Sequence, residues 1–406
     1  MQHGTSSTAR PLWKRLLVAQ ESGLLLVIVL MGLGLTIFGG SKESPVRRDV
    51  PAGATVVVLG PDGREAAPGE LPLTEIVAWE VRPGAGPVRS YPRAEGWRYD
   101  ASESAMFGRI SVNKFLEPNN LLLLASNASF IAVIAVGMTG VIVLAGIDLS
   151  VGSIYALAAV LGAMVMSRFD AAASVWLTVP AALVICCGVG LLLGLANGAM
   201  IVGFRLHPFI ITLGTMSVFR GVAFLSTRGQ TVGGLPGSLQ TDFFKLQVGG
   251  VEPVIPLIML VVALAGWFAL SRTVFGRRIY AIGGNETAAR YAGIPVGRIK
   301  IAVYAIVGML AGLSACMYIG YYGAATSSAG QMYELRVIAA TVVGGASLLG
   351  GRGTALGAVL GAIVIELINN GISILNVDNS YLQVITGAAV IIAVVIDRMK
   401  QGFGNR

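Results

Sequence analysis

Long apolar runs separated by short polar segments dominate the chain. Ten of these runs approach the roughly 20 residues that a helix needs to cross the hydrocarbon core of a membrane. They lie at residues 22–40, 121–145, 149–168, 174–198, 207–226, 254–271, 301–322, 336–350, 354–375 and 381–397. The eighth run is short and rich in glycine, which favours a broken or re-entrant segment. The pattern predicts an all-α polytopic membrane protein with about ten transmembrane helices.

Residues 41–118 interrupt this pattern with a different kind of sequence. The segment has ten basic and eleven acidic residues, scattered prolines and no run long enough to span a membrane. Short apolar stretches such as ATVVVLG, followed by the turn-forming PDGRE, favour strands joined by turns. We therefore expect a small β-rich insertion between the first two membrane helices, and its sequence indicates no chemistry.

Composition and charge support the membrane interpretation and set an orientation. The chain is 55% hydrophobic and only 12% charged, whereas soluble domains have about 25% charged residues. The net charge of +8 could indicate nucleic acid, but the basic residues gather at the ends of apolar runs. Lys14 and Arg15 precede the first run, and Arg398 and Lys400 follow the last one. Because basic loops favour the cytoplasm, both termini are predicted inside and the insertion outside.

This topology divides the chain into five parts. We expect a cytoplasmic N-terminus with the first helix at residues 1–40 and the extracytoplasmic insertion at 41–118. The transmembrane core follows at 119–397 and contains a cytoplasmic loop at 272–300, and the cytoplasmic C-terminus is 398–406. A cleaved signal peptide is the alternative for the first run. The sequence TIFGGSKESP that follows it has no clear Ala-x-Ala cleavage site.

The loop at residues 272–300 has six basic residues and one acid. Asn285 is a suitable N-cap, Glu286 matches the positive end of a helix dipole, and Gly293 followed by Pro295 ends a helix. The predicted helix is only about two turns long, so it is unstable alone in water. It must therefore rest on another surface.

Three alanines give this short helix a small-residue surface. We expect Ala288, Ala289 and Ala292 to form one face that docks in a groove on another protein or another part of the chain. What this face contacts is the main functional question that the sequence raises.

No feature of the sequence indicates a catalytic site. A phosphate-binding G-x-x-x-x-G-K-[ST] loop is absent from the sequence, and the cluster GGRGTALG from Gly350 lacks the Lys-Ser/Thr pair. Cys186, Cys187 and Cys316 lie in apolar runs and are interpreted as small buried hydrophobes. We expect no metal and no cofactor bound by this chain, so any nucleotide hydrolysis must come from a partner.

Glycines also recur at helical spacing within the apolar runs. Gly190, Gly194 and Gly198 form one such stripe, and Gly308 and Gly312 form a pair. Small residues at this spacing let helix backbones approach closely. Packing within one bundle is the favoured interpretation, and a dimer seam is the alternative.

The segment GIDLSVGS carries a polar turn between two apolar runs. Asp148 and Ser150 are good caps for the helix that follows, and Gly152 lies in its first turn. Capping is one interpretation of this turn. A role near a cytoplasmic gate is the other.

Two charges lie inside apolar runs. Arg220 and Glu366 both fall roughly 18–20 Å from the inner side, at 1.5 Å per helical residue. Unpaired charges at that depth are costly. Either the two form an ion pair, or each faces a water-filled path together with Asn369 and Asn370.

Four segments, taken together, resemble a known family. FGRRIYAIGGNETAARYAGI, GIDLSVGS, FIITLGTMSVFRG and YELRVIAATVVGGASLLGGRGT are similar to permease subunits of bacterial ATP-binding-cassette sugar importers of the ribose, xylose and arabinose type. The resemblance covers about residues 119–397. It implies a type II importer architecture in the inner membrane, in which two permease copies or paralogues form the path for a monosaccharide, expected to be a pentose or a related sugar.

The resemblance also implies the partners and the coupling residues. Such importers have a pair of cytoplasmic ATPases that use ATP and Mg, and a periplasmic sugar-binding protein. The family's ATPase-docking helix maps onto Gly284, Asn285, Glu286, Ala288, Ala289 and Gly293. This chain departs from the wider importer signature at Thr287 and by one extra residue before Gly293. The insertion is longer than is typical, so the resemblance implies nothing about it.

Two other functions remain open at this point. A permease for branched-chain amino acids or nucleosides shares the fold and the Asp-Leu-Ser turn. An ion-coupled carrier would need several ionisable groups at mid-membrane and internal repeats, for which only Arg220, Glu366 and a short VLGA repeat qualify. The apolar runs contain few polar groups suited to reading hydroxyls, so sugar selection is expected to lie mostly with the binding protein.

Overall fold

The structure is a computed structural model that describes residues 20–84 and 87–378, with scattered positions between 381 and 391. The chain forms two compact units, residues 34–120 and a helical unit made of the remaining residues. The tenth apolar run and the C-terminus at 398–406 lie largely or wholly outside the described residues, as does most of the segment before the first helix.

Helices account for most of the described residues of the helical unit. Their bounds are α2 Gln20–Phe38, α3 Pro118–Val143, α4 Val151–Met166, α5 Val175–Phe204, α6 Pro208–Thr227, α7 Gly237–Leu239, the π-helical turn η3 Gln240–Phe244, α8 Val254–Arg272, α9 Val274–Gly284, α10 Glu286–Tyr291, α11 Val296–Tyr322, α12 Tyr333–Val343 and α13 Ala355–Ile374. Seven of them are long and apolar enough to cross a membrane, namely α2, α3, α5, α6, α8, α11 and α13. The expected polytopic helical class is confirmed.

Two of the predicted spans are shorter than expected. α4 has 16 residues, because a buried polar turn occupies the chain before Val151. α12 has 11 residues and ends at Gly344, after which the chain continues without regular helix to the N-cap of α13 at Thr354. The eighth run is therefore a broken segment, as its glycines indicated. Short helices are tolerated at membrane depth where protein surrounds them, and most of α4 is buried.

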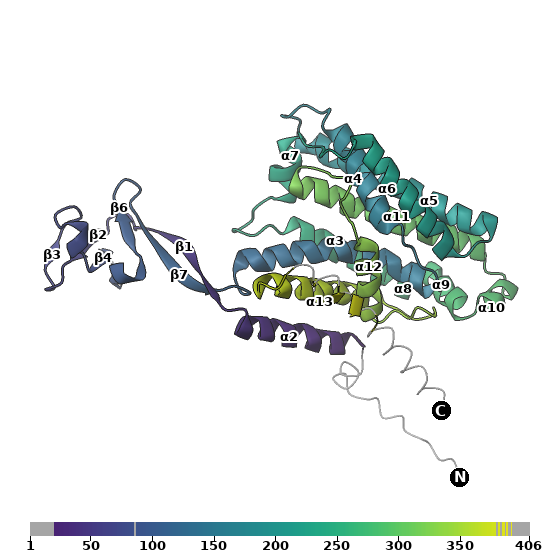
Figure 1. Cartoon of the computed structure of the whole chain (residues 1–406), viewed down its shortest axis with the longest axis horizontal. Helices are drawn as coiled ribbons and strands as arrows, with labels where there is room; N and C mark the ends of the chain where they lie inside the picture. The colour runs from purple at the N-terminus through teal and green to yellow at the C-terminus, as the bar shows by residue number, and fades with distance from the viewer. Residues whose placement is uncertain are drawn as a thin grey trace, which may run out of the picture. The chain divides into compact units, whose positions relative to one another are not determined.

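Close packing of α5 on α11 forms the centre of one group of helices, together with α4 and α6 (Figure 1). A Cβ atom on Gly308 would overlap the carbonyl oxygen of Gly190 and lie 2.8 Å from the Cα of Gly194. One on Gly312 would overlap the carbonyl oxygen of Cys186. The glycine stripes therefore pack within one bundle, and the favoured interpretation is confirmed.

The second unit is β-rich, as its sequence predicted. Its strands are β1 Ser41–Asp49, β2 Thr55–Leu59, β3 Glu65–Ala66, β4 Ala78–Arg82, β5 Arg89–Pro92, β6 Arg98–Asp100 and β7 Ala105–Asn113. They form two antiparallel sheets in the orders β1-β7-β6 and β3-β2-β4-β5. Val58, Trp79, Val81, Trp97 and Met106 are among the residues of its separate hydrophobic core.

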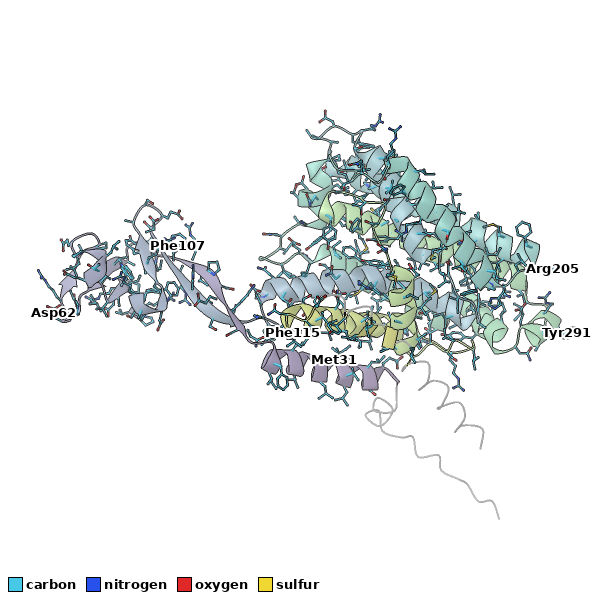
Figure 2. The ribbon with its side chains drawn as sticks, in the orientation of Figure 1. Met31, Asp62, Phe107, Phe115, Arg205 and Tyr291 are labelled. Carbon is cyan, nitrogen blue, oxygen red and sulfur yellow. The ribbon has the colours of Figure 1, made fainter. Side chains whose placement is uncertain are left out.

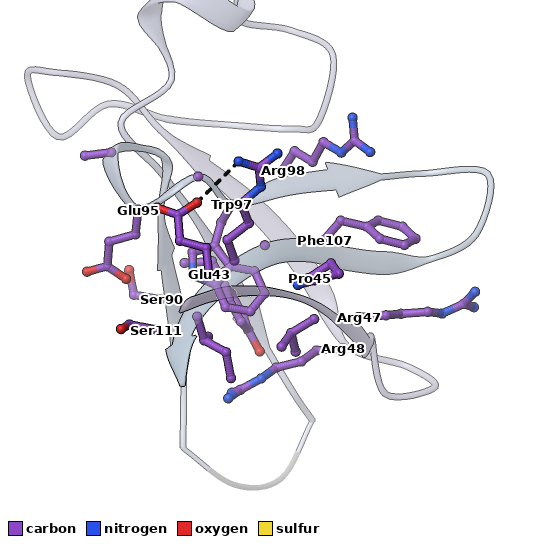
Figure 3. Close-up of a pocket in the computed structure, with 17 residues that line it drawn as sticks. Glu43, Pro45, Arg47, Arg48, Ser90, Glu95, Trp97, Arg98, Phe107 and Ser111 are labelled. Atoms are coloured by element: carbon purple, nitrogen blue, oxygen red, sulfur yellow. Dashed lines mark hydrogen bonds and ion pairs between the residues drawn. The ribbon is translucent and has the colours of Figure 1, made fainter. Parts of the chain in front are cut away.

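A groove of about 1200 Å³ crosses this unit (Figure 3). Arg47 and Arg98 both pair in register with Phe107, and each guanidinium lies 5.8 Å from the centre of the Phe107 ring. Glu43 accepts from Arg109 at 3.3 Å within the same groove. The groove therefore presents both signs of charge around an aromatic ring.

Candidate functional site

The short helix α10 forms where the sequence predicted it. Its N-cap is Asn285, whose Oδ1 accepts from the backbone N–H of Ala288 at 2.9 Å. At its other end the N–H of Gly293 donates to Arg290 at 3.0 Å, and the N–H of Ile294 donates to Ala289 at 3.1 Å. This pair of bonds is a Schellman motif, and it requires the left-handed backbone of Gly293 at φ +77°. Both predicted helix ends are confirmed.

The face that α10 presents differs from the prediction. Ala289 is buried, whereas Ala288 and Ala292 are exposed. Tyr291 lies on the same side of the helix as these two alanines, because positions i, i+3 and i+4 share one side. Its surface is 87% exposed. The prediction that the three alanines form a single face was therefore wrong. Ala289 packs into the permease, and Ala288, Tyr291 and Ala292 form the exposed face. Figure 2 shows Tyr291 and Arg205 at the same end of the helical unit.

Glu286 attaches α10 to the start of α11. Its carboxylate accepts from Lys300 at 2.8 Å and from Arg290 at 2.9 Å. The bond to Lys300, together with Arg290, lowers the pKa of Glu286 below its usual value, so the carboxylate stays ionised at neutral pH. Glu286 therefore positions the helix. Gly284, just before the N-cap, is exposed.

The helix before α10 contacts the centre of the bundle directly. A Cβ atom on Gly283 of α9 would overlap the carbonyl oxygen of Val143 and lie 2.7 Å from the amide nitrogen of Gly351. The hydroxyl of Tyr280 donates to the carbonyl of Gly353 at 2.6 Å. The helix α9 therefore contacts both the end of α3 and the glycine-rich loop after α12.

The start of the first helix lies at this same end. Thr354 Oγ1, at the beginning of α13, donates to Glu21 Oε1 of α2 at 3.1 Å. Thr354 directly follows Gly353, which α9 contacts.

The Asp148 turn is buried and is built differently from a helix cap. Asp148 Oδ1 accepts from the N–H of Ser150 at 2.8 Å and from its hydroxyl at 2.6 Å. Asn197 Nδ2 of α5 donates to Ser150 Oγ at 2.7 Å. Ser150 occupies the N-cap position of α4, but its side chain makes no capping bond. The capping interpretation was therefore wrong, because these bonds close an Asx turn and connect it to α5.

Gly152 brings this turn against α12. A Cβ atom at Gly152 would overlap Glu334 Oε2 and lie 2.7 Å from the carbonyl oxygen of Gly330. Only glycine fits here without displacing the loop before α12. Two segments far apart in the sequence thus meet at Gly152.

Arg220 joins the same region from α6. Its guanidinium donates to the carbonyls of Ser327 at 2.9 Å, Ala329 at 2.6 Å and Gly330 at 3.3 Å. The acid that acts on it electrostatically is Glu334. The proposed ion pair with Glu366 was therefore wrong, because the loop between α11 and α12 supplies carbonyl dipoles that satisfy the planar guanidinium.

Glu366 lies in a second polar cluster, whose members on other helices the sequence did not predict. Its Oε1 accepts from Asn369 Nδ2 at 3.1 Å, and it also interacts with Asn127 of α3 and Arg336 of α12. Tyr322, at the end of α11, donates its hydroxyl to Asn127 Oδ1 at 3.4 Å. Four helices therefore contribute to one group of polar side chains.

Aromatic rings surround this cluster. The ring centres of Tyr318 and Tyr322 are 4.9 Å apart, and Tyr155 lies 5.6 Å from Tyr318 and 5.1 Å from Tyr333. Asn370 lies next to Asn369 on α13 and is partly buried. The signal in the sequence was the concentration of tyrosines in YIGYYG and QMYEL, within otherwise aliphatic runs.

The seven long apolar helices, the broken α12 and the short capped helix α10 are those of a multi-pass membrane protein. Residues 120–394 match the family described as "Branched-chain amino acid transport system / permease component", and the chain belongs to this family. It is therefore a multi-pass membrane protein of the permease class.

Characterised relatives align over most of this region. The ribose import permease protein RbsC of Bacillus subtilis is 41% identical over 70% of this chain and 87% of its own length. The D-allose transport system permease protein AlsC of Escherichia coli is 39% identical over 73% and 88%. The galactose/methyl galactoside import permease protein MglC of Haemophilus influenzae is 34% identical over 70% and 88%. No solved structure matches the chain.

Proposed function

We propose that this chain is the membrane-spanning permease subunit of an ATP-driven, binding-protein-dependent importer that carries a monosaccharide across the inner membrane. The observation that carries this proposal is α10, a capped two-turn helix that presents Ala288, Tyr291 and Ala292 to a partner. The named relatives support a sugar as cargo, because three of them are named for the import or transport of ribose, allose and galactose.

The partners follow from this role. A pair of cytoplasmic ATPases binds ATP and Mg and contacts α10, a periplasmic binding protein delivers the sugar, and a second permease copy or paralogue completes the path. The permease itself makes and breaks no covalent bond. A cytoplasmic start of α2 is supported by the bond between Glu21 and Thr354, since it puts the start of α2 at the end that carries α9 and α10.

The mechanism uses α9 and α10 as one lever. Nucleotide binding in the ATPases displaces α10, and Glu286 carries that displacement to α11 through Lys300. Gly283 and Tyr280 carry it to the end of α3 and the loop before α13. The contacts of Gly152 and Arg220 with the loop before α12 belong to the elements that would rearrange as the path opens to each side.

Reconstitution tests the proposed function. The permease, the ATPase and the binding protein encoded beside it are assembled in proteoliposomes with ATP on the ATPase side. Uptake of ribose, allose or galactose that requires ATP and the binding protein is expected. Uptake driven by a proton gradient without ATP would contradict the proposal, and ATP-dependent uptake of leucine but of no sugar would favour the amino-acid alternative.

Tyr291→Ala is expected to uncouple the importer. Tyrosine is enriched among interface hot spots, whose truncation costs about 2 kcal/mol or more, so sugar uptake should fall at least about tenfold while the permease stays folded. The measurements are uptake and the stimulation of ATP hydrolysis by loaded binding protein. Trp176→Ala is the matched control, because Trp176 is 88% exposed at the start of α5. Equal effects of the two changes would exclude a specific role for Tyr291.

A further inference from the structure

We infer that Tyr322 is a sugar-contacting residue inside the permease, oriented by Asn127 and Glu366. The inference rests on the proposed function and deepens it, because it assigns the permease a share in recognising its cargo. It differs from the expectation that the apolar runs contain few groups suited to reading hydroxyls.

The first argument is the direction of the hydrogen bonds. Asn127 donates its amide Nδ2 to the carboxyl group of Glu366, and its Oδ1 accepts from the hydroxyl of Tyr322. The hydroxyl of Tyr322 therefore donates to Asn127. Its oxygen lone pairs remain for a donor from outside the cluster. The relay from Glu366 through Asn127 sets this direction, and the other carboxylate contact, from Asn369, keeps Glu366 in place.

The second argument is exposure. Glu366 is only 3% exposed, whereas Tyr322 is 46% exposed. The acid is thus the buried member of the cluster, and the tyrosine is its exposed member. Tyr318 supports the ring from behind at 4.9 Å between ring centres.

The third argument is charge. Glu366 faces Arg336, and the other groups near it are Asn127, Asn369, Tyr322 and Tyr333, all neutral. The charges of Glu366 and Arg336 have opposite signs. The exposed part of the cluster is an aromatic face with one oriented hydroxyl. A sugar matches this surface, because it has an apolar C–H face and hydroxyls that both donate and accept, and ligand sites combine apolar rings with a few fixed polar groups.

An interfacial aromatic anchor is the simpler explanation of an exposed tyrosine in a membrane protein. Such an anchor turns its hydroxyl toward water and headgroups. Tyr322 instead donates its hydroxyl to Asn127, which contacts a buried carboxylate. The inward hydrogen bond favours a site over an anchor.

The test compares Tyr322→Phe with Tyr318→Phe in the reconstituted importer. Tyr322→Phe removes the hydroxyl and keeps the ring, and Tyr318→Phe removes the hydroxyl of the supporting ring. We expect Tyr322→Phe to lower sugar transported per ATP hydrolysed about fivefold or more, since one lost hydrogen bond to a solute contributes about 1 kcal/mol. ATP hydrolysis stimulated by the loaded binding protein should stay within twofold, and Tyr318→Phe should behave as the wild type.

A second variant tests the relay, and each outcome is decisive. Glu366→Ala should lower transport per ATP in the same way and change the ratio of ribose, allose and galactose uptake as Tyr322→Phe does. Unchanged transport per ATP and unchanged sugar ratios in Tyr322→Phe would overturn the inference. Parallel loss of ATP hydrolysis, transport and folded protein on gel filtration would also overturn it, as evidence for a purely structural role. If the wild-type importer carries no sugar, the proposed function itself fails, and that result is seen before any variant is made.

Discussion

Gly308→Leu is expected to remove most of the folded permease. α5 and α11 approach so closely that even a Cβ atom at Gly308 would overlap the carbonyl oxygen of Gly190 and lie 2.8 Å from the Cα of Gly194. These are backbone atoms, which cannot rotate away as a side chain does. Overpacking a core costs typically 1–3 kcal/mol, and we expect about 3 kcal/mol or more here because the two helices must separate.

The measurement for Gly308→Leu is the fraction of monodisperse protein on gel filtration, with the melting temperature of what remains. Gly188→Leu on α5 is the matched control, because no atom lies within 4 Å of a Cβ built there. The control should yield wild-type amounts. If Gly308→Leu folds as well as Gly188→Leu, α5 and α11 are not in backbone contact at this position.

Arg220→Leu is expected to release the loop between α11 and α12 and to reduce transport strongly. Its guanidinium donates three hydrogen bonds to the carbonyls at 327, 329 and 330. A hydrogen bond to a charged group contributes about 1.5–3 kcal/mol. Losing even one therefore lowers the equilibrium ratio of anchored to released loop about tenfold or more. Arg220→Lys keeps the charge but cannot reach all three carbonyls from one ammonium group, and an intermediate effect is expected.

The Arg220 variants are measured by sugar uptake and by limited proteolysis within residues 323–332. The double change Arg220→Glu with Glu366→Arg provides a sharp control. It should not restore transport, because the two residues bond to different partners. Restoration by the double change would show that they form a functional pair.

Local features of the sequence predicted α10 well. Each of its ends depends on contacts between residues close in sequence, at Asn285 for the start and at Gly293 for the finish, and both ends form as expected. Its presented face was predicted less well. The three alanines are chemically equal, but Ala289 is buried in the core, whereas Ala288 and Ala292 lie in the exposed face together with Tyr291.

Contacts between distant segments were not predictable in the same way. Arg220 and Glu366 lie at similar depth along their helices, and this depth was the only basis for predicting an ion pair between them. In the structure each of them bonds to other partners. Depth along a helix does not determine the side of the helix from which a side chain points or which loop packs into the bundle. The polar cluster of Asn127, Tyr322 and Glu366 was missed for the same reason, since its members come from three helices.

The sequence by itself determined that this protein crosses the membrane many times, carries a β-rich insertion and exposes a short capped loop helix. Apolar length, alternation and capping residues specify these features through interactions between near neighbours. Only the tertiary structure decided that Gly152 fits beneath Glu334, that Arg220 binds loop carbonyls, and that a buried carboxylate orients an exposed tyrosine. Those pairings depend on how the helices rotate and pack against one another, and no local pattern in the chain specifies that.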